Sequence, residues 1–496
     1  MPTFSDILSE AGIAARSLAD LFSGRALRLG VTGLAGAGKT IFVTALVQQL
    51  TLAARLAALG EKNPLPVFRV HAEGRLMGAR LEPQPDDAVP RFAYEEHLDV
   101  LTGRQGRSQD RAWPQSTKRI SELRLTLEFE RTASLGRRRP AELSIDIVDY
   151  PGEWLLDLTL LEKSYRRWSE ESLVAAEARA PLGAEWWNYV QGLDANAPAE
   201  EEVARRAAAL FKTFLQACRA APLAASSLPP GRFLMPGDLE GSPLLTFSPL
   251  KLEAEARPGS LAAMMTRRYE AYRAHVVRPF FRDHFARLDR QIVLVDVLAA
   301  LNAGPMALRD LERALGDVLN AFRTGKNSIL SSLLRPKIDK ILFAATKADH
   351  LNHVSHDRLE AILRRLTARA IARAENLGAA IDVVALAAVR ATREANVGRG
   401  GAMLPAVIGM PLKGERIGDE SFDGETEVAI FPGQLPEDPD AVFAGNWWAT
   451  DPREAEYRFV RFRPPIVARD AAGMPLPLPH IRLDRALQFL LGDRLR

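Results

Sequence analysis

The apolar residues of this chain follow two kinds of spacing, which alternate along it. Short apolar runs typical of buried β-strands lie at residues 27–32, 291–297, 340–345 and 381–386. Runs 121–129 and 143–148 alternate apolar and polar residues, and the short basic linker 131–140 between them predicts an antiparallel hairpin. Helical spacing separates the later strands, which favours a largely parallel sheet with helices on both faces. The pattern therefore predicts an α/β fold.

Three parts of the chain depart from this alternation. Residues 4–22 have the spacing of an amphipathic helix. We expect it to pack on the protein's own surface, with docking to a partner or to lipid as the alternative. Residues 154–290 are mostly helical in pattern, which predicts an inserted helical domain or a lid. From residue 400 onward Pro and Gly become frequent, which predicts a small β-rich elaboration with a closing helix at 484–491.

The finer expectations complete this outline. Helices are expected at 92–101, 154–177, 198–221, 260–288, 306–334 and 358–376, and short strands at 65–71, 427–431 and 457–462. The predicted division of the chain is an N-terminal helix (1–25), a first core part (26–153), the helical insertion (154–290), a second core part (291–399) and the β-rich elaboration with its closing helix (400–496).

Residues 33–40, with the sequence GLAGAGKT, fit the phosphate-binding pattern G-x-x-x-x-G-K-[ST]. A predicted strand precedes them and helical spacing follows, as this P-loop pattern requires. The glycines let backbone N–H groups surround a phosphate at a helix start, Lys39 would reach the β- and γ-phosphates, and the Thr40 hydroxyl would bind Mg²⁺. A glycine-rich turn without a ligand is the alternative. The predicted nucleotide-binding residues here are Gly33, Ala35, Gly36, Ala37, Gly38, Lys39, Thr40 and Ile41.

Two further motifs follow predicted strands. Asp149 and Gly152 stand in the sequence DYPGE directly after run 143–148, where the carboxylate would hold the Mg²⁺ shell and the glycine N–H would contact the γ-phosphate. A plain acidic turn is the alternative. The second motif is Thr346, Lys347 and Asp349 in the sequence TKAD after run 340–345. Its carboxylate would accept hydrogen bonds from guanine, and adenine lacks that donor pair, so the motif favours GTP over ATP.

The composition of the chain indicates its compartment and its class of partner, but not the reaction it catalyses. The 496 residues carry a net charge of +3, which is too small to indicate nucleic-acid binding. One cysteine, Cys218, excludes a disulfide framework and fits a reducing compartment. We find no signal peptide and no apolar run long enough to span a bilayer, so we expect a cytoplasmic protein that meets a membrane only through a partner.

The motifs occur in the order GxxxxGKT, WPxST, DYPGE and TKAD, and this order resembles that of the YcjX-like family of bacterial P-loop GTPases over nearly the whole chain. The resemblance implies a Ras-like core, binding of GTP and GDP with Mg²⁺, and an association with envelope-stress responses in some bacteria. It also implies a membrane-protein partner, and a peripheral location at the inner membrane through that partner.

The resemblance also assigns residues by motif. Thr117, with Ser116 as the fallback, occupies the position of the switch I threonine that binds Mg²⁺, so the metal set is Thr40, Thr117 and Asp149. A backbone contact to the base is expected from the segment Ala387-Ala388-Val389, chiefly from Ala388 or Val389. Glu153 stands where many GTPases have a water-orienting glutamine. The catalytic set is Lys39, Thr117, Gly152 and Glu153.

These assignments predict a GTPase that acts as a conformational switch. An ionised carboxylate at Glu153 would repel the γ-phosphate, although held at a distance it could polarise a water, and Ala35 adds a methyl group nearby. We therefore expect slow intrinsic hydrolysis that needs a partner, an oligomer or a cation supplied in trans. Two alternatives remain open at this point: a P-loop ATPase in which TKAD is accidental, and a scaffold that binds nucleotide without turning it over.

Overall fold

The computed structural model describes most of the chain. The described residues are 26–34, 36–59, 64–103, 107–115, 119–132, 138–177, 179–220, 228–252, 256–320, 338–376, 378–399, 402–444, 457, 459–471 and 473–496. The helix predicted at 4–22 and the end of the helix predicted at 306–334 lie outside them.

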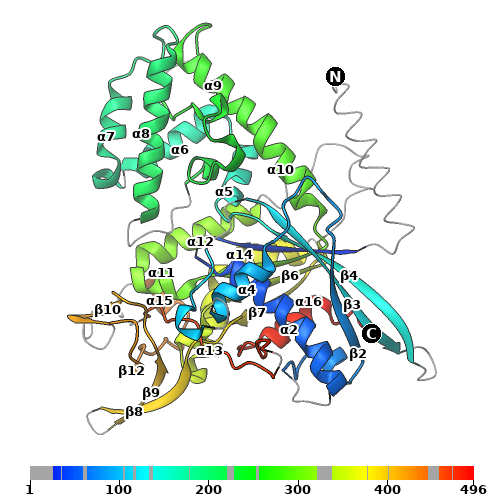
Figure 1. Cartoon of the computed structure of the whole chain (residues 1–496). Helices are drawn as coiled ribbons and strands as arrows, with labels where there is room; N and C mark the ends of the chain where they lie inside the picture. Colours follow the sequence, from blue (N-terminus) through cyan, green and yellow to red (C-terminus); the bar gives the residue numbers. More distant parts are fainter. Residues whose placement is uncertain are drawn as a thin grey trace.

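A seven-stranded sheet forms the centre of the molecule, with the order β2-β3-β4-β1-β5-β6-β7 (Figure 1). Its strands are β1 (Leu27–Gly33), β2 (Leu76–Glu82), β3 (Ser121–Thr132), β4 (Arg138–Asp149), β5 (Arg290–Val295), β6 (Lys340–Ala345) and β7 (Ala380–Ala385). The pairs from β4 to β7 are parallel, whereas β2–β3 and β3–β4 are antiparallel. The predicted hairpin and all six strands named for the core are confirmed. The strand expected at 65–71 is wrong, because that segment ends in a short helix, α3 (Arg69–Ala72), and the edge strand β2 follows it.

Both faces of the sheet are covered, and the alternation along β5 shows how. Ile292 and Leu294 belong to one hydrophobic core, and Val293 and Val295 belong to another. Side chains of a strand alternate between the faces, so an unbroken apolar run is buried only when helices cover both. The first face carries α2 (Lys39–Leu59), α4 (Tyr94–Thr102) and α16 (Leu483–Leu491), and the second carries α11 (Val297–Ala303), α12 (Pro305–Asn320), α13 (His356–Leu366) and α14 (Ala368–Asn376).

The helical insertion has a core of its own above the sheet in the view of Figure 1. Its helices are α5 (Trp154–Leu158), α6 (Tyr165–Glu177), α7 (Ala180–Gln191), α8 (Glu201–Ala220), α9 (Leu261–Tyr272) and α10 (Arg278–Asp283). The core is aromatic: the ring of Trp168 stacks on Tyr269 at 5.1 Å between centroids, and Trp186 stacks on Phe214 at 5.3 Å. Helix 154–177 is interrupted, because Lys163 between α5 and α6 has an extended backbone.

The C-terminal part contains a three-stranded antiparallel sheet of β8 (Arg393–Arg399), β9 (Ala402–Gly409) and β12 (Val428–Ile430), with β10 (Arg416–Ile417), β11 (Glu420–Ser421) and α15 (Ala441–Ala444) nearby. The strand predicted at 427–431 is confirmed as β12. The strand predicted at 457–462 is wrong: in the described residues of this segment Phe462 makes an isolated bridge to Pro411. The closing helix α16 packs on the main sheet rather than on this small one.

The architecture is therefore the predicted α/β class, a P-loop core of Ras-like topology with a helical insertion and a β-rich C-terminal part. Among the described residues, no helix is both long and apolar enough to cross a membrane.

Candidate functional site

The P-loop lies between the end of β1 at Gly33 and the start of α2 at Lys39. Gly36 and Gly38 have φ angles of 77° and 85°, in the left-handed region where glycine is favoured, so the loop can turn its N–H groups inward. The Lys39 ammonium folds back over the loop and donates to the carbonyls of Gly33, at 2.8 Å, and Leu34, at 3.4 Å. Ala35 lies outside the described residues.

Lys39 is buried among several charges. Burial lowers the pKa of its ammonium, the carboxylates of Asp149 and Glu153 raise it, and the guanidinium of Arg219 lowers it again. These four side chains therefore form one electrostatic group at the P-loop, although they come from three separate parts of the chain.

Thr40 and Asp149 are the two described members of the predicted metal set. Thr40 lies in the first turn of α2, and Asp149 ends β4, whose register places it beside Val31 of β1. Both side chains are buried. A hydroxyl and a carboxylate oxygen are hard ligands that suit Mg²⁺, which commonly takes its other ligands from water and phosphate. The third predicted ligand, Thr117, and its fallback Ser116 lie outside the described residues.

The segment after β4 runs directly under the P-loop. A Cβ atom on Gly152 would lie 1.9 Å from the carbonyl oxygen of Gly33, so no other residue fits there without a backbone shift. The hydroxyl of Tyr150 hydrogen-bonds to that of Thr32 on β1 at 3.0 Å. Glu153 forms an ion pair with Arg219 of α8, with 2.6 Å between Oε1 and Nη2.

The loop after β6 carries the predicted base-binding residues. The Thr346 hydroxyl donates to the carbonyl of Val295 at 3.3 Å, and Lys347, in the left-handed region at φ 60°, pairs with Asp296. One carboxylate oxygen of Asp349 accepts from the backbone N–H of Ala391 at 2.8 Å. These bonds orient the motif from the end of β5 and from the loop between β7 and β8, rather than from the P-loop.

The loop after β7 contains the predicted backbone contact. The backbone N–H of Ala387 donates to the carbonyl of Ile481 at 3.1 Å, so in this structure that N–H is not free to contact a base. Ala388 and Val389 follow, and both pack against the core that includes α2 and α16.

The structure brings the described predicted residues to one edge of the sheet, because β1, β4, β6 and β7 are parallel and all end there. Sequence reasoning missed Arg219, Asp296 and Ala391. Asp296 directly follows the carboxyl end of β5, which is a usable signal. Arg219 and Ala391 have no such signal, since only the packing of distant segments places them.

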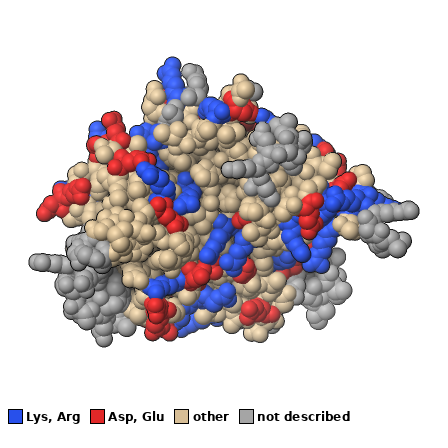
Figure 2. Space-filling view, turned by 90° about the horizontal axis from the view of Figure 1, so that it is seen from below, with Lys and Arg blue, Asp and Glu red and all other residues tan. Residues whose placement is uncertain are grey.

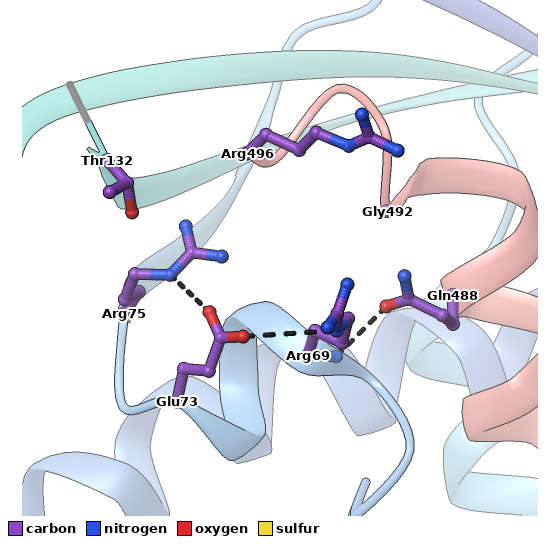
Figure 3. Close-up of a pocket in the computed structure, with 7 residues that line it drawn as sticks. All are labelled: Arg69, Glu73, Arg75, Thr132, Gln488, Gly492 and Arg496. Atoms are coloured by element: carbon purple, nitrogen blue, oxygen red, sulfur yellow. Dashed lines mark hydrogen bonds and ion pairs between the residues drawn. The ribbon is translucent and has the colours of Figure 1, made fainter. Parts of the chain in front are cut away.

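A separate pocket of about 470 Å³ lies between α3 and α16 (Figure 3). Arg75 pairs there with Glu73 at 2.7 Å, and Gln488 accepts from the backbone N–H of Arg69 at 3.0 Å. Gly492 also lines the pocket, and the next residue, Asp493, pairs with Arg290 at the amino end of β5. The P-loop follows the carboxyl end of β1, which is parallel to β5, so the pocket lies at the opposite edge of the sheet. It does not belong to the candidate site.

The surface charge agrees with the small net charge of the chain. On the face shown in Figure 2, described Lys and Arg side chains are interspersed with Asp and Glu. A continuous basic field of the kind that binds a nucleic-acid backbone does not cover the described part of this face.

Comparisons with known proteins agree along almost the whole chain. The model of the YcjX-like family, DUF463, matches residues 27–495. The chain is 38% identical over 485 residues to the Ras-like GTPase YcjX of Escherichia coli (strain K12), covering 95% of this chain and 96% of that protein. It is 34% identical over 497 residues to the Ras-like GTPase YcjX of Shewanella oneidensis (strain MR-1), covering 97% of each. Because the family model spans residues 27–495 and both relatives are more than 30% identical over nearly their whole length, this chain belongs to the YcjX-like family.

Proposed function

We propose that this protein binds GTP and hydrolyses it slowly to GDP and phosphate with Mg²⁺, and that the bound nucleotide sets the conformation of the helical insertion. The observation that carries the proposal is that Lys39 of the P-loop and Gly152 of the DYPGE motif both lie against the carbonyl oxygen of Gly33. Lys39 donates to Gly33 O, and the backbone of Gly152 lies against the same atom. A γ-phosphate that draws on Lys39 and on the N–H of Gly152 would act on both loops together.

The roles of the side chains follow from their chemistry. Lys39 and the P-loop N–H groups would hold the phosphates, and Thr40 and Asp149 would hold Mg²⁺, which neutralises phosphate charge when bound. Thr117 is proposed as the further metal ligand. Asp349 would accept from guanine, with Lys347 along the ring, Thr346 supporting the loop, and Ala388 or Val389 donating from the backbone.

The path from the nucleotide to the insertion is short. Glu153 is followed directly by α5, and Trp154 packs edge-on against Phe280 of α10 at 5.8 Å between centroids. A movement of residues 149–153 would therefore be transmitted to the insertion core. A protein partner that reads this movement, a membrane protein among the candidates, and a role in envelope stress are proposals that rest on the family resemblance alone.

Base preference tests the proposal. Fluorescent GDP, ADP and xanthosine diphosphate would each be titrated, with Mg²⁺, into the parent protein and the Asp349→Asn variant. We expect tight GDP binding and weak ADP binding by the parent, and a shift toward xanthine nucleotide in the variant, whose amide reverses one hydrogen bond. Asp357→Asn is the matched control, because Asp357 is exposed on α13 and pairs only with Arg482 among the described residues.

The outcomes separate the alternatives. Equal binding of both bases that Asp349→Asn leaves unchanged would favour an ATPase. Selective GDP binding without any single-turnover hydrolysis of GTP would favour a nucleotide-stabilised scaffold.

A further inference from the structure

The last turn of α8 brings a cation from the insertion to the P-loop. Arg219 lies 66 residues beyond Glu153 in the sequence, yet its guanidinium forms an ion pair with that carboxylate at 2.6 Å. The Glu153 side chain is 8% exposed, whereas that of Arg219 is 35% exposed. The carboxylate is thus enclosed, and the guanidinium keeps an accessible side.

This ion pair lies close to the group that would bind the phosphates. Both of its charges act on the Lys39 ammonium, since Glu153 raises and Arg219 lowers the pKa of that group. A guanidinium has five N–H donors in a fixed plane, and Glu153 engages one of its terminal nitrogens. The remaining donors suit phosphate oxygens.

We propose that Arg219 contacts the terminal phosphate of GTP during hydrolysis, so that the helical insertion completes the catalytic site in cis, with Glu153 as its positioning residue. The inference rests on the proposed GTPase function. It replaces the cation in trans expected from the sequence, and it reduces the repulsion expected from Glu153, because a carboxylate paired with Arg219 repels the γ-phosphate less than a free one.

The chemical step needs no proton from Arg219. A water oxygen bonds to the γ-phosphorus, the bond to the β–γ bridging oxygen breaks, and its electron pair stays on GDP. The proton that the water loses leaves with the phosphate product. Arg219 offsets the negative charge on the γ-phosphate and bridging oxygens as this bond breaks, a contribution worth about 10³-fold or more where an arginine serves this role.

Single-turnover GTP hydrolysis by the full chain tests the proposal. We expect Arg219→Ala to slow the rate by about 10³-fold and Arg219→Lys to recover only a part, because an ammonium lacks the planar fork. GDP affinity stays within about threefold of the parent, since the contact is to the terminal phosphate. Arg205→Ala is the matched control: Arg205 lies on the same helix and pairs with Glu201 at 3.4 Å.

Two readouts distinguish a catalytic from a structural role. Added guanidinium should restore hydrolysis in Arg219→Ala but not in Gly152→Ala, and the parent, unlike Arg219→Ala, should bind GDP with aluminium fluoride as a stable complex. Glu153→Gln should slow the parent yet cause no further loss in the Arg219→Ala background.

Failure of the proposed GTPase function and failure of the role of Arg219 give different results. A parent that binds GDP but never hydrolyses GTP overturns the proposed function. A parent that hydrolyses GTP, with Arg219→Ala at the same rate, overturns only the role of Arg219. If Arg219→Ala melts early or loses GDP binding, Arg219→Gln decides by the same two readouts, and a parental rate in that variant likewise overturns the role.

Discussion

Single glycines set the distance between the loops of the candidate site. Gly152 lies against the P-loop, and the next residue, Glu153, lies against the insertion, because a Cβ on Gly231 would lie 1.8 Å from the carbonyl oxygen of Glu153. Residues 152 and 153 are therefore held between the backbones of Gly33 and Gly231, and neither Gly152 nor Gly231 has space for a methyl group. The glycine in DYPGE is required by packing as well as by its proposed contact to phosphate.

Substituting Gly152 with alanine should cost about 1–3 kcal/mol of stability, because the P-loop carbonyl has to move. Nucleotide affinity should fall with it, since the same carbonyl holds Lys39. Chemical denaturation and GDP titration would measure both. Gly192→Ala is the control, because a Cβ there meets its nearest atom at 3.6 Å. Equal effects of the two substitutions would contradict the close approach.

At the scale of elements, α5 is fixed by one buried carboxylate. Asp157 accepts hydrogen bonds from the N–H groups of Gly231, at 2.6 Å, and Arg232, at 3.3 Å, and from the hydroxyl of Tyr272 at 2.7 Å. Since α5 directly follows Glu153, these bonds tie the segment 149–153 to two distant parts of the insertion. Any nucleotide-driven movement of α5 has to carry or break them.

Asp157 predicts a specific pH dependence. Burial raises its pKa from 3.8 to about 6, with the hydrogen bonds from Tyr272 and Gly231 opposing the shift. Because the folded state binds the proton more tightly, the stability from this group is full below pH 3.8 and is lost as pH rises through about 6.

We therefore expect the parent to lose up to about 3 kcal/mol of stability relative to Asp157→Asn between pH 4 and pH 7. Denaturation of both proteins across that range measures the difference between their free energies of unfolding. Groups that titrate alike in the two proteins cancel in this difference. Asp238→Asn is the control, since Asp238 is largely exposed beside Arg232. A difference that stays flat with pH would show that Asp157 titrates normally.

A strand could be predicted from the sequence where its own apolar pattern requires burial, and could not where only pairing with a neighbouring strand makes it a strand. Strands β5, β6 and β7 have apolar runs that are buried on both faces, so their pattern alone identifies them. Strand β2 has a mixed pattern at the sheet edge, and only pairing with β3 makes it a strand.

At the scale of the whole molecule, the C-terminal segment 462–464 contacts two separate parts of the candidate site: the segment that leads to Thr117, and the base-binding loop. Trp113 donates from its indole N–H to the carbonyl of Phe462 at 2.6 Å, and Arg111 donates to that of Pro464 at 2.6 Å. The ring of His350, next to Asp349, packs edge-on against Phe462 at 5.3 Å between centroids. The segment that leads to Thr117 and the base-binding loop thus share one support.

Trp113→Phe should lower the free energy of unfolding by about 1–3 kcal/mol, because it removes the indole donor and leaves the Phe462 carbonyl without that bond. Thermal and chemical denaturation measure the loss. Trp187→Phe is the control, since the indole N–H of Trp187 has no hydrogen bond to another described residue. Equal stability of Trp113→Phe and the parent would show that water replaces the bond at no cost.

The sequence by itself determined the α/β class, the three loops and their order, because each depends on short-range features: an apolar period, a glycine pattern and a residue at a strand end. Only the tertiary structure decided that Arg219 reaches Glu153, that Asp296 holds Lys347, and that the C-terminal segment supports the base loop. These contacts join residues about 50 or more positions apart, and local spacing contains no information on which distant side chain will meet a buried charge.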